Sequence, residues 1–105
     1  MDIQLRRGVL DYCVLAVIKE EESYGYMIIK QMESLLPISE STLYPILKRL
    51  ESNKLVSSYS VEHNGRLRKY YQIMPNGIEN LNEFVVSWKE VETIFNYIKG
   101  VSEND

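Results

Sequence analysis

The pattern of apolar and polar residues predicts two helices in the first third of the chain. Apolar residues recur at steps of three and four from Leu5 to Lys19, which is typical of an amphipathic helix. The same spacing continues from Tyr24 to Leu35 and predicts a second helix. Ser23 can cap that helix at its N-terminus, and Pro37 ends it.

A third helix is predicted to begin at Ser39 or Ser41, either of which can cap it, and to end near Asn53. Pro45 lies inside this segment, where a proline removes a backbone donor and crowds the preceding turn. Either the helix begins nearer Tyr44, or its first turn is irregular and the missing bond falls on an exposed carbonyl. The second interpretation is favoured because one apolar stripe continues across the proline, formed by Leu43, Ile46, Leu47 and Leu50.

A β-hairpin is predicted next, from two segments rich in valine, tyrosine, serine and isoleucine. The segments are Leu55 to His63 and Arg66 to Met74, and Asn64-Gly65 between them suits a two-residue turn with positive φ at both positions. That turn sets the register and puts on one side of the hairpin His63 with Arg66, Val61 with Arg68, and Tyr59 with Tyr70. The other side, which would pack on the helices, holds Val56, Tyr71 and Ile73; a longer turn would exchange the two faces.

Three helices followed by a hairpin form a winged helix-turn-helix, so a DNA-binding domain that is mainly α with a two-stranded β wing is expected over residues 1–75. A long fourth helix follows the Pro75-Asn76-Gly77 break, from about Ile78 to Lys99. Its apolar residues fall on heptad a and d positions, namely Leu81, Phe84, Trp88, Val91, Phe95 and Ile98. A helix of that length exceeds what the small body can cover, so residues 76–100 are predicted to be a dimerisation helix, and 101–105 a polar tail.

Charge is distributed unevenly along the chain. The formal net charge is −3, yet the stretch from Ser41 to Met74 holds six basic and two acidic residues, while both flanking parts are acidic. One basic segment on an acidic body is typical of a protein that presents a single face to a polyanion. The exposed side of the third helix and the wing therefore supply the candidate DNA-binding residues, which are Ser41, Thr42, Tyr44, Lys48, Arg49, His63, Arg66, Arg68 and Lys69.

Nothing in the sequence favours an enzyme. His63 is the only histidine and lies beside a turn, so no catalytic triad, metal site or cofactor is predicted. Cys13, the only cysteine, stands in an apolar run and is interpreted as a buried residue. With no membrane span, no signal peptide and no disulfide pair, a cytoplasmic location is expected.

Trp88 on the last helix has two interpretations. It packs in the dimer interface, or two symmetry-related Trp88 rings flank a gap that accepts a flat aromatic effector. In the second case the walls of the effector site would come from both ends of the chain, namely Leu10, Val14, Phe84, Trp88, Val91 and Phe95.

The chain resembles the PadR family of bacterial transcriptional regulators. The resemblance rests on Leu10 to Leu15, Ser23-Tyr24-Gly25-Tyr26, the third-helix string Thr42 to Glu51, the wing string Gly65 to Tyr71, and Asn76-Gly77. It implies a homodimeric winged-helix repressor that binds a pseudo-palindromic operator, in the smaller branch of the family with one C-terminal helix. It also implies that proline is normal within the recognition helix, and that some members bind flat aromatic compounds beside a tryptophan at the dimer centre.

The sequence is also compatible with a function of another class. Winged helices also dock on proteins, and the net acidic charge is compatible with an interaction module that binds a protein partner and no DNA.

Overall fold

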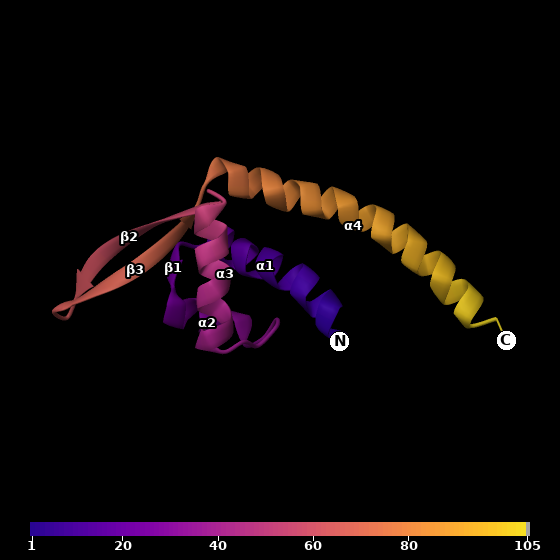
Figure 1. The fold of residues 1–105 in the computed structure, drawn as a ribbon, viewed down its shortest axis with the longest axis horizontal. Helices are drawn as coiled ribbons and strands as arrows, with labels where there is room; N and C mark the ends of the chain where they lie inside the picture. The colour runs from indigo at the N-terminus through magenta and orange to yellow at the C-terminus, as the bar shows by residue number, and fades with distance from the viewer. Residues whose placement is uncertain (105) are drawn as a thin grey trace.

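A computed structural model describes the fold of residues 1–104. Four helices and three strands make up these described residues (Figure 1). They are α1 (Ile3–Glu20), β1 (Ser23–Tyr24), α2 (Gly25–Met32), α3 (Glu40–Ser52), β2 (Val56–His63), β3 (Arg66–Ile73) and α4 (Pro75–Ser102). The first three helices form a small body, the hairpin projects to one side, and α4 projects to the other (Figure 1). None of these helices is both long and apolar enough to cross a membrane.

The core lies where α1, α2 and α3 meet the base of the sheet. Its fully buried side chains include Leu15, Ile18, Ile28, Met32, Leu43 and Leu47. The predicted stripe of α3 is confirmed, because Leu43, Ile46, Leu47 and Leu50 are all buried. Burying a large aliphatic side chain contributes about 1.5–3 kcal/mol, so this cluster fixes how α3 sits on the body.

Pro45 lies inside α3, beyond its first turn. The helix runs unbroken from Glu40 to Ser52, so it does not begin near Tyr44. Proline removes the bond that would reach the carbonyl of Ser41, an exposed residue in the first turn. The exposed carbonyl is open to water, which explains why the proline is compatible with the helix.

The sheet has three strands, in the order β1-β3-β2. The hairpin register is the predicted one, with His63 opposite Arg66 across the turn of Asn64 and Gly65, both at positive φ. The third strand, β1, is not predicted from the sequence. The prediction places Ser23 as the N-terminal cap of α2. Ser23 instead pairs with Tyr71 and is buried, while Tyr24 precedes α2 without a side-chain cap bond.

Helix α4 begins three residues earlier than predicted. Pro75 occupies the first helical position, where its missing N–H costs nothing. Gly77 allows the helix to pass close to the start of β2, because a Cβ there would lie 2.3 Å from the carbonyl oxygen of Leu55. The segment Pro75-Asn76-Gly77 is therefore a helix start and not a break.

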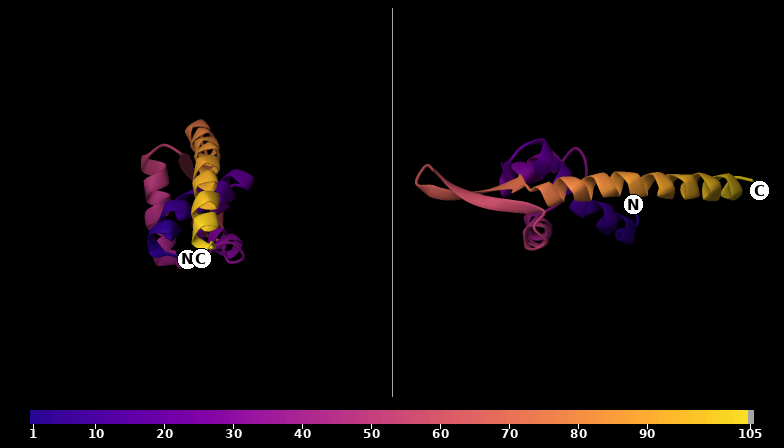
Figure 2. Two further views of the ribbon diagram at one scale, coloured as in Figure 1. Left: turned by 90° about the vertical axis from the view of Figure 1, so that its right-hand side faces the viewer. Right: turned by 90° about the horizontal axis from the view of Figure 1, so that it is seen from above.

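The far end of α4 also differs from the prediction. It continues through Val101 and Ser102, whereas the sequence predicts a polar tail from residue 101. Asp105 lies outside the described residues. With 28 residues the helix is about 42 Å long, and the molecule measures 64 × 27 × 20 Å. Seen from above, the second half of α4 extends beyond the body (Figure 2).

Candidate functional site

The outward face of α3 is polar. The five residues predicted to contact DNA from this helix are all exposed: Ser41, Thr42, Tyr44, Lys48 and Arg49. The hydroxyls at its start are linked, since Ser39 Oγ lies 2.9 Å from Ser41 Oγ and 3.2 Å from Thr42 Oγ1. The first turn of α3 therefore presents a cluster of hydroxyls that can donate or accept hydrogen bonds.

Arg49 is engaged within the chain. Its guanidinium donates to both carboxylate oxygens of Asp11 on α1, at 2.9 and 3.2 Å. Hydrogen bonding to Asp11 raises the pKa of Arg49, and the arginine side chain is still 55% exposed. Asp11 thus neutralises part of the positive charge of Arg49 at the surface that is predicted to bind DNA.

The basic residues of the wing differ in their surroundings. Lys69 forms an ion pair of 3.5 Å with Glu51 of α3, and Glu51 also accepts a hydrogen bond from Ser58. Arg68 lies over the ring of Tyr24, with its Cζ 4.1 Å from the ring centroid. Both contacts tie the wing to the body, so Arg68 and Lys69 have a structural role as well as a positive charge.

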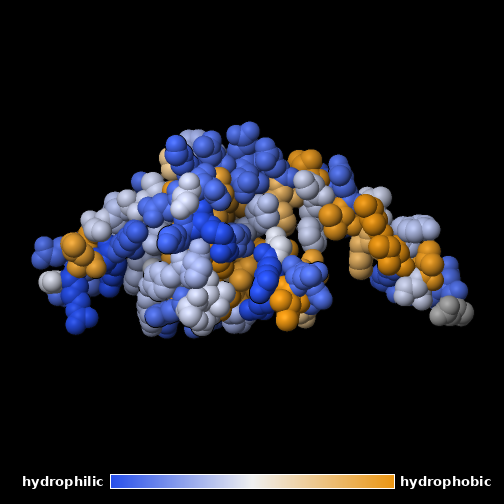
Figure 3. Space-filling view, in the orientation of Figure 1, coloured by the Kyte–Doolittle hydropathy of each residue, from blue (hydrophilic) through white to orange (hydrophobic). Residues whose placement is uncertain are grey.

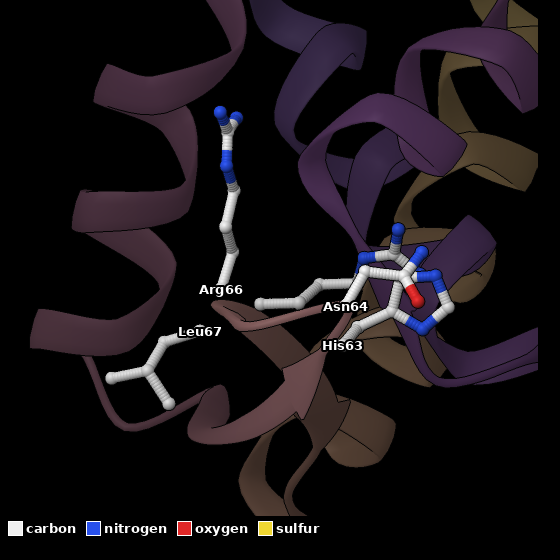
Figure 4. Close-up of a pocket in the computed structure, with 5 residues that line it drawn as sticks. His63, Asn64, Arg66 and Leu67 are labelled. Atoms are coloured by element: carbon white, nitrogen blue, oxygen red, sulfur yellow. The ribbon is translucent and has the colours of Figure 1, made fainter.

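The tip of the wing is more open. His63, Asn64, Arg66 and Leu67 are exposed and, with Arg68, line a shallow hollow around the turn. Figure 4 shows the side chains of Arg66 and Leu67 leaving the hairpin in different directions, with His63 and Asn64 together at the other side of the turn. Arg66 is therefore an exposed cation at the tip of the wing.

Several tyrosines beside these residues are not among the predicted site residues. Tyr24 and Tyr59 both pack against Tyr70 on one face of the sheet, at centroid distances of 5.3 and 5.6 Å. Tyr26, on the first turn of α2, is exposed and lies beneath the amine of Lys30, 5.4 Å from the ring centroid. The only sequence signal for Tyr24 and Tyr26 was their position in the string Ser23-Tyr24-Gly25-Tyr26.

The second candidate surface is the apolar side of α4. Figure 3 shows hydrophobic residues gathered on the projecting part of this helix. The exposed ones are Val85, Val86, Trp88, Val91, Ile94, Phe95, Tyr97, Ile98 and Val101. Leu81 and Phe84 are half-buried, and Leu81 packs on the core of its own chain.

An apolar groove of about 430 Å³ lies between the near part of α4 and α1. Its lining includes Val9, Tyr12 and Cys13 of α1, and the ring of Tyr12 stacks on Phe84 at 4.2 Å. Leu10 and Val14, predicted as walls of an effector site, do not lie on this groove. Val14 is fully buried in the core and Leu10 nearly so, because α1 turns its other side toward α4.

Comparison with known proteins agrees with this architecture. The model of the PadR-like family of transcriptional regulators matches residues 14–83. An uncharacterized protein of Lysinibacillus sphaericus is 37% identical over 93 residues, covering 84% of this chain and 85% of that protein. A PadR-like transcriptional regulator of Bacillus cereus is 37% identical, with a TM-score of 0.78 over 90% of this chain and 95% of that chain.

A more distant structure shows the same fold. Bacillus subtilis PadR, solved in complex with operator DNA, is 22% identical and gives a TM-score of 0.69 over 74% of this chain and 47% of that chain. The family match covers most of the chain and most of the winged helix-turn-helix within it. This protein belongs to the PadR-like family of transcriptional regulators.

Proposed function

We propose that the protein is a homodimeric, sequence-specific DNA-binding repressor, of the family's smaller branch with one C-terminal helix. The observation that carries the proposal is the exposed polar face of α3 beside a basic wing. A recognition helix reads base edges in the major groove while phosphate contacts fix its register. Bacillus subtilis PadR, which shares the fold, was solved with operator DNA, and this supports the same use of the fold here.

The proposed role of each residue follows from its contacts. Ser41, Thr42 and Lys48 lie exposed on α3 and are assigned to bases and adjacent phosphates. Arg66 and His63 at the wing tip are assigned to the backbone or the neighbouring minor groove. The remaining basic residues contribute charge to the same surface while they hold separate elements together, namely Arg49, Arg68 and Lys69.

The dimer is inferred from the exposed side of α4. Trp88, Val91, Phe95 and Ile98 form its main apolar stripe, and each is exposed in the single chain. A neighbouring sector of the helix adds further exposed apolar residues, namely Val86, Ile94, Tyr97 and Val101. Soluble monomers rarely expose such a continuous patch, and a second copy of α4 with its neighbouring groove can cover it.

The effector proposal centres on Trp88. Its ring is tilted against Phe84 at 5.7 Å, and Phe84 stacks on Tyr12. A dimer axis near Trp88 would place two such aromatic rows face to face and leave room for a flat aromatic compound between them. Because Leu10 and Val14 are buried, Tyr12 replaces them in the proposed site.

The DNA-binding proposal is tested by the double variant Arg66→Ala with Arg68→Ala. It should weaken binding to every duplex and flatten the dependence of affinity on salt by about 0.9 in slope for each phosphate that is no longer neutralised. Lys99→Ala is a matched control, since it removes an exposed cation near the far end of α4, on the opposite side of the body from the wing (Figure 1). Unchanged affinity and slope in the double variant would remove the wing from the proposed interface.

The effector proposal has its own test in Trp88→Ala. A variant that stays dimeric but does not respond to aromatic ligands that release the parent from DNA supports a site at the dimer centre. The opposite result has two parts: the parent protein responds to no aromatic ligand, and Trp88→Ala no longer dimerises. That result would make Trp88 a packing residue of the dimer interface.

A further inference from the structure

One surface hollow, a cleft of about 540 Å³, lies between the start of α2, α3 and β3. The described residues that form it include no acid and combine tyrosines with basic side chains, namely Tyr24, Gly25, Tyr26, Tyr44, Arg66, Leu67, Arg68, Lys69 and Tyr71. Tyrosine hydroxyls next to arginines form a setting for a phosphate oxyanion, which accepts hydrogen bonds and attracts cations.

The cleft exists because β1 is short. Its two residues pair only with Tyr70 and Tyr71, so the same edge of β3 has no strand beside it from Arg66 to Lys69 in the described sheet. An unpaired strand edge leaves backbone N–H and C=O groups without partners from the sheet. Here that open edge faces the corner between α2 and α3.

The absence of a side chain at Gly25 leaves room for the hydroxyl of Tyr44 in this corner. A Cβ added at Gly25 would lie 2.6 Å from Tyr44 Oη and 3.1 Å from the ring carbon Cζ. The ring of Tyr44 therefore lies directly against the start of α2, which only a residue without a side chain permits. This placement directs Tyr44 to the cleft on the wing side of α3.

Several cations lie at or beside the cleft, and one of them, Lys69, is ion-paired with Glu51. The amine of Lys30 lies 5.4 Å from the ring centroid of Tyr26, and hydrogen bonding to Tyr26 raises the pKa of the lysine. Arg68 lies over Tyr24, so its guanidinium is fixed at the wall of the cleft. Arg66 lines the same cleft from the outer end of β3.

We propose that this cleft binds one phosphodiester of the DNA backbone, with Tyr44 and Tyr26 as hydroxyl donors and Arg66 and Arg68 as cations. The inference rests on the proposed DNA-binding function and deepens it. Tyr44 then positions the protein on the duplex and reads no base. The cleft lies beside α3, on the flank where a backbone strand runs when a helix enters the major groove.

The cleft is tested by two variants that each remove only a hydroxyl, Tyr44→Phe and Tyr26→Phe. Tyr59→Phe is the matched control. The hydroxyl of Tyr59 donates to Glu22 and lies outside the cleft. The affinity of each variant for a selected operator and for a random duplex should fall by the same factor. For Tyr44→Phe the factor should be roughly tenfold, which corresponds to the loss of one hydrogen bond to a charged group. The salt slope should stay unchanged because every cation is retained, whereas Arg66→Ala lowers it by about 0.9.

Gly25→Ala provides an independent variant. The added methyl displaces the flexible end of Tyr44, so DNA binding should weaken as in Tyr44→Phe while the thermal unfolding midpoint stays near that of the parent. Normal binding by Gly25→Ala, or by Tyr44→Phe, refutes the cleft while leaving DNA binding itself intact. A weaker complex with the operator but not with the random duplex would mean that Tyr44 reads a base and also refutes it. A parent protein that binds neither duplex would refute both the cleft and the proposed function.

Discussion

Phe95 and Ile98 near the end of α4 offer a quantitative test of dimerisation. They are 55% and 57% exposed in the single chain, and an extended apolar surface surrounds them. Complete burial of such a side chain contributes about 1.5–3 kcal/mol, so covering the exposed half contributes about 1 kcal/mol. A two-fold dimer uses both residues twice. Replacing them with alanine should therefore weaken association by about 4 kcal/mol, or close to a thousandfold in the dimer dissociation constant.

Sedimentation equilibrium over a range of concentrations measures that constant for the parent and for Phe95→Ala with Ile98→Ala. Asn96→Ala is the matched control, since Asn96 is an exposed polar residue on the same helical turns. The double variant should keep the helix content of the parent, because both residues lie outside the core. If the double variant and the control dimerise equally well, α4 is not the dimer interface and the inference from its exposed face is wrong.

Two further predictions concern close contacts inside the chain. Gly77→Ala should lower the free energy of unfolding by about 1–3 kcal/mol, because the added methyl meets the backbone of Leu55. Gly100→Ala adds its methyl in open space and should raise the free energy of unfolding by about 0.5–1 kcal/mol. Thermal unfolding midpoints that shift in the same direction for both variants would contradict this. Asp11→Asn should release Arg49 and steepen the salt dependence of DNA binding by up to about 0.9 in slope. An unchanged slope in that variant would show that Arg49 contacts no phosphate.

Local signals in the sequence predict the presence of the four helices and the hairpin, although α2 ends at Met32 and not at Leu35. Asn64-Gly65 specifies a two-residue turn through its own backbone preferences, and the turn then determines every pair of β2 and β3. The stripe across Pro45 is likewise visible in the sequence, since the burial of α3 is periodic. These features depend on residues that are neighbours in the chain.

The features that the sequence does not predict depend on contacts between distant segments. β1 has two residues, too few for any periodic pattern, and exists only because β3 lies beside it. The apolar residues of α1 between Val9 and Ile18 lie on more than one side of the helix, so their spacing could not show that Val14 faces the core while Val9 faces α4. The contacts of Arg49 with Asp11 and of Arg68 with Tyr24 join separate elements, and no sequence spacing predicts them.

We propose that a dimer of this chain binds a specific inverted repeat. Selection of genomic DNA fragments by the purified protein at near-physiological salt, followed by sequencing, tests it most directly. We expect enrichment of one inverted repeat, with half-sites about one helical turn or a multiple apart, so that the two α3 helices enter major grooves on the same face of the duplex. A folded, dimeric protein that enriches no sequence, and that instead forms a stable complex with another protein, would contradict this claim and favour an interaction module.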